Sequence, residues 1–390
     1  MISNNNKKPQ KYQFKTYKVI DLDEDVNAYA IIVLKNGDIL AGTDREQLFV
    51  FSPEDNFAII GYTDTETSIL NLTELSHNNY IALSCFKMMC IYKYEIISGK
   101  YIFHFIQKFE VTGKCHNYQI RATYELKNKE LLQSLHSYDI SFIVYTFNEN
   151  KYQQTTNVCF DIKKDDCYYD LGNVITTDNF LQMDDGNILV SSFIKYKLIL
   201  IENNTYKTLN IYHDIKCVGC CNSFCKVDSQ HFIITTNKGL ALFEYPKLII
   251  IKYFDNEKWM NGVNVINTFF YVSGDTEGKI YLYEKNKKKS DEFNFNLESV
   301  IISKLDHITC LTKYKNYIIL GGTKFVIQII KIEDYDGTED DKNDLFEQNK
   351  HEEHMLQLKK IQEMIENLHQ PAHYAFRLPK KKKKDKKTYY

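Results

Sequence analysis

The stretch Phe269–Glu284, FFYVSGDTEGKIYLYE, decides the fold of this 390-residue chain. Two runs rich in aromatic and β-branched residues, Phe269–Ser273 and Lys279–Tyr283, flank a segment that contains Gly274 and Gly278. Such residues favour strands, and glycine adopts the backbone conformations of tight turns. Similar units recur at about the 40–50-residue spacing of propeller blades. The sequence therefore predicts a repeat-built β-propeller.

Seven such units can be distinguished along the chain. They occupy residues 30–51, 69–109, 120–147, 180–201, 224–253, 269–284 and 308–332. The first contains Asn36-Gly37 between two apolar runs, which is the strongest short signal for a β-hairpin. The third has no clear turn signature and is the weakest. We expect an all-β fold in which a seven-bladed β-propeller with four-stranded blades spans residues 14–332.

The two ends of this region suggest how the ring closes. Phe14–Leu22 is a strand-like run that precedes the first unit, whereas the seventh unit supplies only three strands before the chain becomes acidic. The spare strand and the missing one match in number. We therefore expect Phe14–Leu22 to complete the last blade, which leaves only short, protected strand edges.

These repeats resemble the WD-repeat family of β-propellers, whose units end in the dipeptide Trp-Asp. In the sixth unit Ser273–Asp275 matches the family's turn, and Tyr283 and Glu284 take the places of Trp and Asp. Phe51 takes the Trp position in the first unit, and Ser191 begins the corresponding match in the fourth. No unit keeps the Trp-Asp dipeptide or the family's opening Gly-His. The resemblance implies a non-catalytic scaffold for partner proteins, with Tyr283 and Phe51 packed in the core.

One segment precedes the predicted propeller and three follow it. Residues 1–13 before it are expected to be disordered, and residues 333–344 after it form an acidic linker. Residues 345–369 carry Leu358, Ile361, Ile365 and Leu368 at the spacing of one face of an amphipathic helix. This helix could dock on a partner or form a short coiled coil. Residues 370–390 form a lysine-rich tail.

The lysine tail is the candidate site for a polyanion or for a nuclear import receptor. It contains a cluster of Lys380, Lys381, Lys382, Lys383, Lys384, Lys386 and Lys387. A basic run of this kind acts as a nuclear import signal, as a phosphate-contacting arm for nucleic acid, or only as a solubilising end. The net charge of −2 gives the chain as a whole no attraction to polyanions. All three interpretations stay open.

A group of cysteines raises the question of a metal site. It consists of Cys217, Cys220, Cys221 and Cys225, with His213 and His231 nearby. Cys-x-x-Cys with further ligands can hold zinc, but Cys221 and Cys225 fall in the predicted inner strand of the fifth unit. Neighbouring residues of a strand point to opposite faces, so convergence of these thiolates is unfavourable. We expect buried, unligated cysteines and no metal or other cofactor.

Further sequence signals bear on compartment and chemistry. No apolar run approaches the roughly 18–20 residues that span a bilayer, and the N-terminus lacks the apolar core of a signal peptide. We expect an intracellular protein, cytoplasmic or also nuclear, with other proteins as partners and no membrane. No nucleophile elbow, phosphate-binding loop or dinucleotide fingerprint occurs, so we expect no enzyme. The alternatives are a nuclear or RNA-associated assembly factor recruited by the tail, and a metal-binding or enzymatic propeller.

Overall fold

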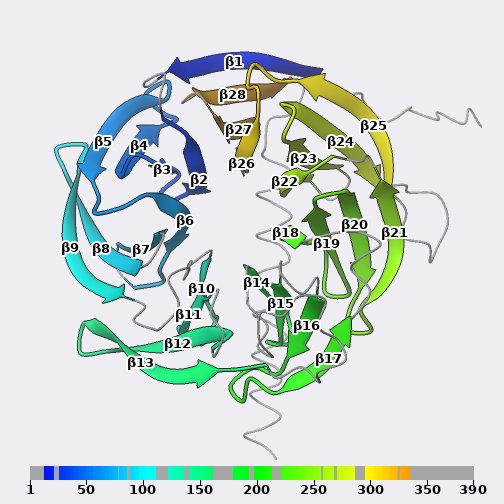
Figure 1. The fold of residues 1–390 in the computed structure, drawn as a ribbon. Coiled ribbons are helices and arrows are strands. Elements are labelled where there is room, and N and C mark those ends of the chain that lie inside the picture. Colours follow the sequence, from blue (N-terminus) through cyan, green and yellow to red (C-terminus); the bar gives the residue numbers. More distant parts are fainter. Residues whose placement is uncertain are drawn as a thin grey trace, which may run out of the picture. The chain divides into compact units, whose positions relative to one another are not determined.

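The computed structural model describes residues 13–21, 26–77, 79–85, 88–110, 122–135, 140–160, 179–192, 197–212, 221–255, 258–267, 270–285, 295–323 and 326–333. These residues form strands, turns and short connections, with no helix among them. The strands make seven four-stranded antiparallel sheets arranged around a common centre (Figure 1). The predicted seven-bladed β-propeller is confirmed. The predicted helix at 345–369 and the tail lie outside the described residues.

Each blade runs from an inner to an outer strand in chain order. Blades 1 to 3 consist of β2 (Ala28–Val33), β3 (Ile39–Thr43), β4 (Gln47–Ser52) and β5 (Ala58–Asp64), then β6 (Ile69–Glu74), β7 (Tyr80–Cys85), β8 (Met88–Ile97) and β9 (Lys100–Glu110), then β10 (Thr123–Glu125), β11 (Leu131–Ser134), β12 (Phe142–Asn148) and β13 (Lys151–Val158). Blades 4 to 6 consist of β14 (Asn179–Gln182), β15 (Ile188–Ser192), β16 (Lys197–Ile201) and β17 (Thr208–Tyr212), then β18 (Cys221–Lys226), β19 (His231–Thr236), β20 (Gly239–Glu244) and β21 (Ile249–Asp255), then β22 (Met260–Asn267), β23 (Phe270–Asp275), β24 (Lys279–Lys285) and β25 (Phe295–Ile302).

Blade 7 closes the ring with a strand from the other end of the chain. It contains β26 (Ile308–Tyr314), β27 (Tyr317–Gly322) and β28 (Val326–Glu333), and its outer strand is β1 (Gln13–Asp21). β1 and β28 pair antiparallel from Gln13 opposite Glu333 to Asp21 opposite Val326. The Gln328 amide donates a hydrogen bond to Thr16 Oγ1 at 2.9 Å. The predicted closure is confirmed, with the strand one residue earlier than expected.

The core lies between neighbouring blades. The middle strands β3, β15 and β16 are buried along their whole length, because both faces of each sheet are covered by adjacent sheets. Phe51 is 1% exposed and packs with Ile319 and Ile329 of blade 7. Tyr283 is 3% exposed and packs with residues of blade 5 such as Leu242. Both aromatics are core residues, as predicted.

The sequence units were too short in several blades. β5, β13, β17 and β25 form outer strands that lie beyond the ends of the predicted units, and β22 is an inner strand ahead of the sixth unit. β13 reads KYQQTTNV and is exposed at most positions. An outer strand with little burial needs no apolar alternation, so its sequence lacks the signal by which strands are recognised.

Candidate functional site

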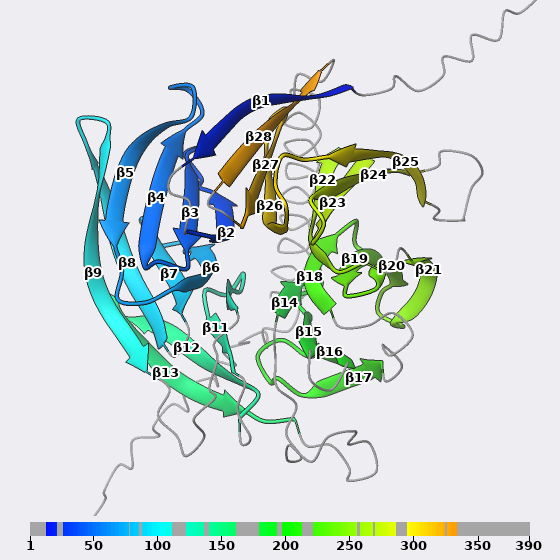
Figure 2. The same cartoon turned by 45° about the horizontal axis from the view of Figure 1, so that its top comes forward.

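In blades 1, 3, 4 and 5, the turns between the first and second strands and between the third and fourth strands lie at one end of the ring. We call it the turn face; in blade 1 it comprises residues 34–38 and 53–57 (Figure 2). In blade 1 the backbone N–H of Asp38 donates to Asn36 Oδ1 at 3.1 Å. In blade 4 the backbone N–H of Asn187 donates to Asp185 Oδ1 at 3.0 Å. A hydrogen bond from the backbone to an Asn or Asp side chain two residues earlier stabilises the turn. Gly37 has a φ of 91°, a left-handed conformation that favours glycine.

A tyrosine from the following blade anchors several of these turns. The junction tyrosines are Tyr101, Tyr206 and Tyr245, and their hydroxyls donate to Asp38 at 2.7 Å, to Glu130 at 2.6 Å and to Asp185 respectively. All three side chains are buried. Burial raises the pKa of each tyrosine above its ordinary value of 10.0, and the carboxylate that accepts the hydrogen bond raises it further. The tyrosines therefore remain neutral donors at physiological pH.

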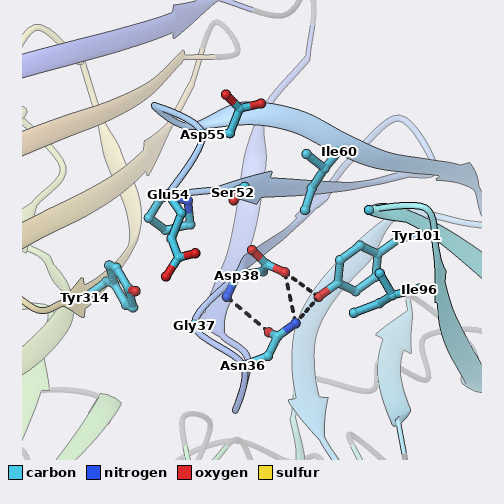
Figure 3. A pocket seen from close by; sticks show the side chains of 12 residues that line it. Asn36, Gly37, Asp38, Ser52, Glu54, Asp55, Ile60, Ile96, Tyr101 and Tyr314 are labelled. Carbon is cyan, nitrogen blue, oxygen red and sulfur yellow. Dashed lines mark hydrogen bonds between the residues drawn. The ribbon is translucent and has the colours of Figure 1, made fainter.

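A pocket opens on the turn face where blades 1, 2 and 7 meet (Figure 3). Its volume is about 340 Å³. The walls come from the Asn36–Asp38 turn, the Ser52–Asp55 turn, Ile60 of β5, Ile96, Gly99 and Tyr101 of the β8–β9 hairpin, and Tyr314 of β26. This volume lies at the lower end of the range for small-ligand pockets. The pocket is large enough to hold one long side chain.

Two carboxylates face this pocket. Asp38 Oδ2 accepts hydrogen bonds from the Tyr101 hydroxyl and, at 2.9 Å, from the Asn36 amide. Its other oxygen, Oδ1, accepts none from the residues that the structure describes. Glu54 extends into the space between Tyr314 and the Asn36–Asp38 turn, as Figure 3 shows. No described residue forms an ion pair with Glu54, and no wall residue is basic. The pocket can therefore accept hydrogen bonds from a cation.

An exposed apolar tip stands beside the pocket. β8 and β9 have 10 and 11 residues, and the turn that joins them contains Gly99. No atom lies within 4 Å of the position that a Cβ of Gly99 would occupy. Ile96 is 47% exposed and Ile97 is 53% exposed. We call these two residues the isoleucine tip. β9 lies beside β5, whose Ile59 is also exposed (Figures 1 and 2).

The sites proposed from the sequence are only partly within the described residues. The lysine cluster at 380–387 lies outside them, as do Cys217, Cys220 and His213. Cys221 and Cys225 lie on β18, the inner strand of blade 5, as predicted. Burial raises the pKa of Cys225 to about 12, so its thiol stays protonated. Among the described residues no group of three or more His, Cys, Asp and Glu side chains could hold a metal.

The pocket itself was not found by sequence reasoning. Asn36-Gly37 was recognised as a hairpin turn, but nothing in the sequence places it beside Glu54, Ile96 and Tyr314. One available signal was the Ile-Ile-Ser-Gly sequence at 96–99, where two large apolar residues precede a turn. Apolar residues at a hairpin tip are unusual, because such turns normally face water.

Comparisons with known proteins bear on the fold. No protein-family model and no curated protein matches the sequence. A solved structure of the WD40 β-propeller domain of Doa1 superimposes with a TM-score of 0.62 at 12% sequence identity, covering 82% of this chain and 98% of the other. Within the described residues, no helix is long and apolar enough to traverse a bilayer. The chain has the fold of a WD40 β-propeller domain.

Proposed function

We propose that this protein is a non-catalytic scaffold that binds partner proteins through its turn face. WD40 propellers typically act as platforms for protein interactions, and this chain shares their fold. Fold alone does not establish function, so the site has to support the proposal. The supporting observation is the isoleucine tip beside a pocket with an unpaired carboxylate.

The isoleucine tip favours protein contact for a simple energetic reason. Its two isoleucines are about half exposed, on a hairpin whose turn glycine has free space around it. Burying one such side chain against a partner contributes about 1.5–3 kcal/mol. Adjacent apolar side chains of this kind mark interaction sites more often than isolated ones do. The tip and the pocket together form the candidate docking site of this face.

Affinity purification of the full chain from its native cells tests this function. We compare the wild type with an Ile96→Ser/Ile97→Ser variant and with a control variant, Leu209→Ser. Leu209 is 51% exposed on β17, so the control changes a similar surface on another blade. We expect partners to remain with the wild type and the control and to be lost from the tip variant. Equal recovery from all three would contradict binding at this face.

The lysine tail supports a second proposal, which concerns location. The cluster at 380–387 would direct this scaffold to the nucleus, or would bring it to RNA. A fluorescent reporter fused to residues 370–390 is the test. Nuclear accumulation that disappears when Lys380–Lys384 are changed to Ala supports an import signal. A diffuse reporter whose tail binds RNA in a salt-sensitive manner supports nucleic-acid contact instead.

A further inference from the structure

We propose that the pocket between blades 1, 2 and 7 receives a lysine or arginine side chain of an extended partner segment. An apolar residue two positions from that basic residue, on the same side of the extended segment, packs on the isoleucine tip. This inference rests on the proposed scaffold function and adds the chemistry of the partner that it binds. The occupant is a peptide segment of another protein, because the pocket combines a place for one cation with an adjoining apolar surface.

Charge complementarity is the first reason. Asp38 and Glu54 face the pocket, Asp55 lies at its rim, and no Lys, Arg or His is among the wall residues. Carboxylates on one wall repel each other, and a cation that enters between them lowers this repulsion. Hydrogen bonds to charged groups are roughly twice as strong as those between neutral groups.

Preorganisation is the second reason. The Asp38 carboxylate is already held by Tyr101 and Asn36, so its free oxygen, Oδ1, needs no further ordering to accept a donor. Binding to a fixed group costs less conformational entropy than binding to a mobile one. Gly37 contributes to this geometry, since a Cβ there would lie 3.0 Å from the Tyr314 hydroxyl. The absence of a side chain at Gly37 lets Tyr314 close that side of the pocket.

The apolar walls account for the rest of the basic side chain. Ile60 and Ile96 line the pocket opposite Tyr314. Lysine and arginine bury their methylene stems on apolar surface while their charged ends find polar partners. The Lys315 ammonium lies 5.0 Å from the centroid of the Tyr314 ring, within the range of a cation–π contact.

Ile96 connects the pocket to the isoleucine tip. It lines the pocket and is also 47% exposed at the tip, next to Ile97. A segment whose basic side chain enters the pocket therefore passes directly over these two isoleucines. The site requires blades 1, 2 and 7 together, so it exists only in the closed ring.

Selection from a random-peptide display library on the purified full chain tests this chemistry. We compare the wild type with Glu54→Gln, which removes a charge at constant size. The matched control is Glu149→Gln, because Glu149 lies in the corresponding turn of blade 3 and is also exposed. We expect wild-type binders to be enriched in Lys or Arg with an apolar residue two positions away. We expect Glu54→Gln to weaken them about tenfold or more, and Glu149→Gln to leave them unchanged.

Two outcomes would overturn the inference. Enriched peptides without basic residues would show that the pocket does not select a cation. Basic peptides that bind Glu54→Gln as tightly as the wild type would show that they bind elsewhere. Melting temperatures of the variants verify that each one folds. Native partners that depend on the isoleucine tip but not on Glu54 would leave the scaffold function standing while this partner chemistry fails.

Discussion

The junctions between blades 1 and 2 and between blades 4 and 5 are held by the same three side-chain types. The first uses Tyr101, Asp38 and Asn36, and the second uses Tyr245, Asp185 and Asn187. The two junctions differ in the hairpins next to these hydrogen bonds. In blade 5 residues 245–248 join β20 to β21, and the side-chain amide of Asn210 in blade 4 donates to the Lys247 carbonyl at 3.3 Å. In blade 2 the hairpin extends further and ends in exposed isoleucines.

From this difference we infer that the Tyr-Asp-Asn arrangement has a structural role and the isoleucine tip a functional one. The Tyr-Asp-Asn arrangement recurs, as expected for a contact that joins one repeat to the next. The isoleucine tip of blade 2 adds nothing to that contact, and half of its apolar surface faces water. We therefore expect substitutions in the shared arrangement to change stability at both junctions, and substitutions at the tip to change binding alone.

The largest effect on stability should come from removing the strand that closes the ring. Deleting residues 1–24 removes β1 and leaves the β28 edge unpaired. We expect a loss of stability beyond the about 3–5 kcal/mol of a single buried aromatic truncation, measured by thermal or urea denaturation. Deleting only residues 1–12 leaves β1 in place and serves as the control. An unchanged melting temperature after the longer deletion would mean that β1 does not support the ring.

The next largest effect concerns the junction tyrosines. Tyr101→Ala and Tyr245→Ala each remove a buried aromatic ring and one of the hydrogen bonds that a carboxylate accepts. We expect each to cost about 3–5 kcal/mol in the free energy of unfolding. Urea denaturation of the two variants beside the wild type measures this. Similar losses would support a shared structural role, whereas a small loss at only one junction would break the equivalence.

Alkaline pH should weaken all three junctions that the tyrosines hold, between blades 1 and 2, 3 and 4, and 4 and 5. The pKa values of Tyr101, Tyr206 and Tyr245 are raised by burial above the ordinary 10.0, so the folded chain holds their protons when the unfolded chain has released them. Stability is therefore fully present below about pH 10 and falls as pH rises toward the folded pKa values. Urea midpoints measured across this range, with tyrosinate absorbance, test it. A midpoint that does not change would contradict buried, neutral tyrosines.

The smallest effect on stability should come from the isoleucine tip. Ile97→Ser changes a half-exposed side chain, and we expect its unfolding free energy to stay within about 0.5 kcal/mol of the wild type. Leu209→Ser should behave in the same way. Only Ile97→Ser should reduce partner binding. A substantial loss of stability at Ile97 would show that the tip packs against the ring and is not free to bind.

Much of the fold could be predicted because blades repeat. Apolar middle strands such as β16, read KLILI, carry a strong local signal, and Asn36-Gly37 and Asp185-Gly186 mark turns. Ring closure followed from counting strands. The outer strands were missed where one or both faces meet water, as in β13, because burial is what produces the apolar pattern.

The pocket could not be predicted for a different reason. Its walls come from four segments, around residues 36–38, 52–60, 96–101 and 314, which meet only when blades 1, 2 and 7 are assembled. Asp38 and Glu54 look like ordinary turn residues in the sequence. Their shared orientation is a property of tertiary structure, which local propensity does not encode.

The pairing of β1 with β28 also sets an order of events during synthesis. Thr16 and Gln328, which are hydrogen-bonded across this pair, are 312 positions apart in the chain. At about 5–20 residues per second, β1 leaves the ribosome on the order of tens of seconds before its partner strand. It must wait unpaired while blades 1 to 6 form. A chain cut short before blade 7 lacks both closure and Tyr314, so only a chain translated through blade 7 offers the pocket to a partner.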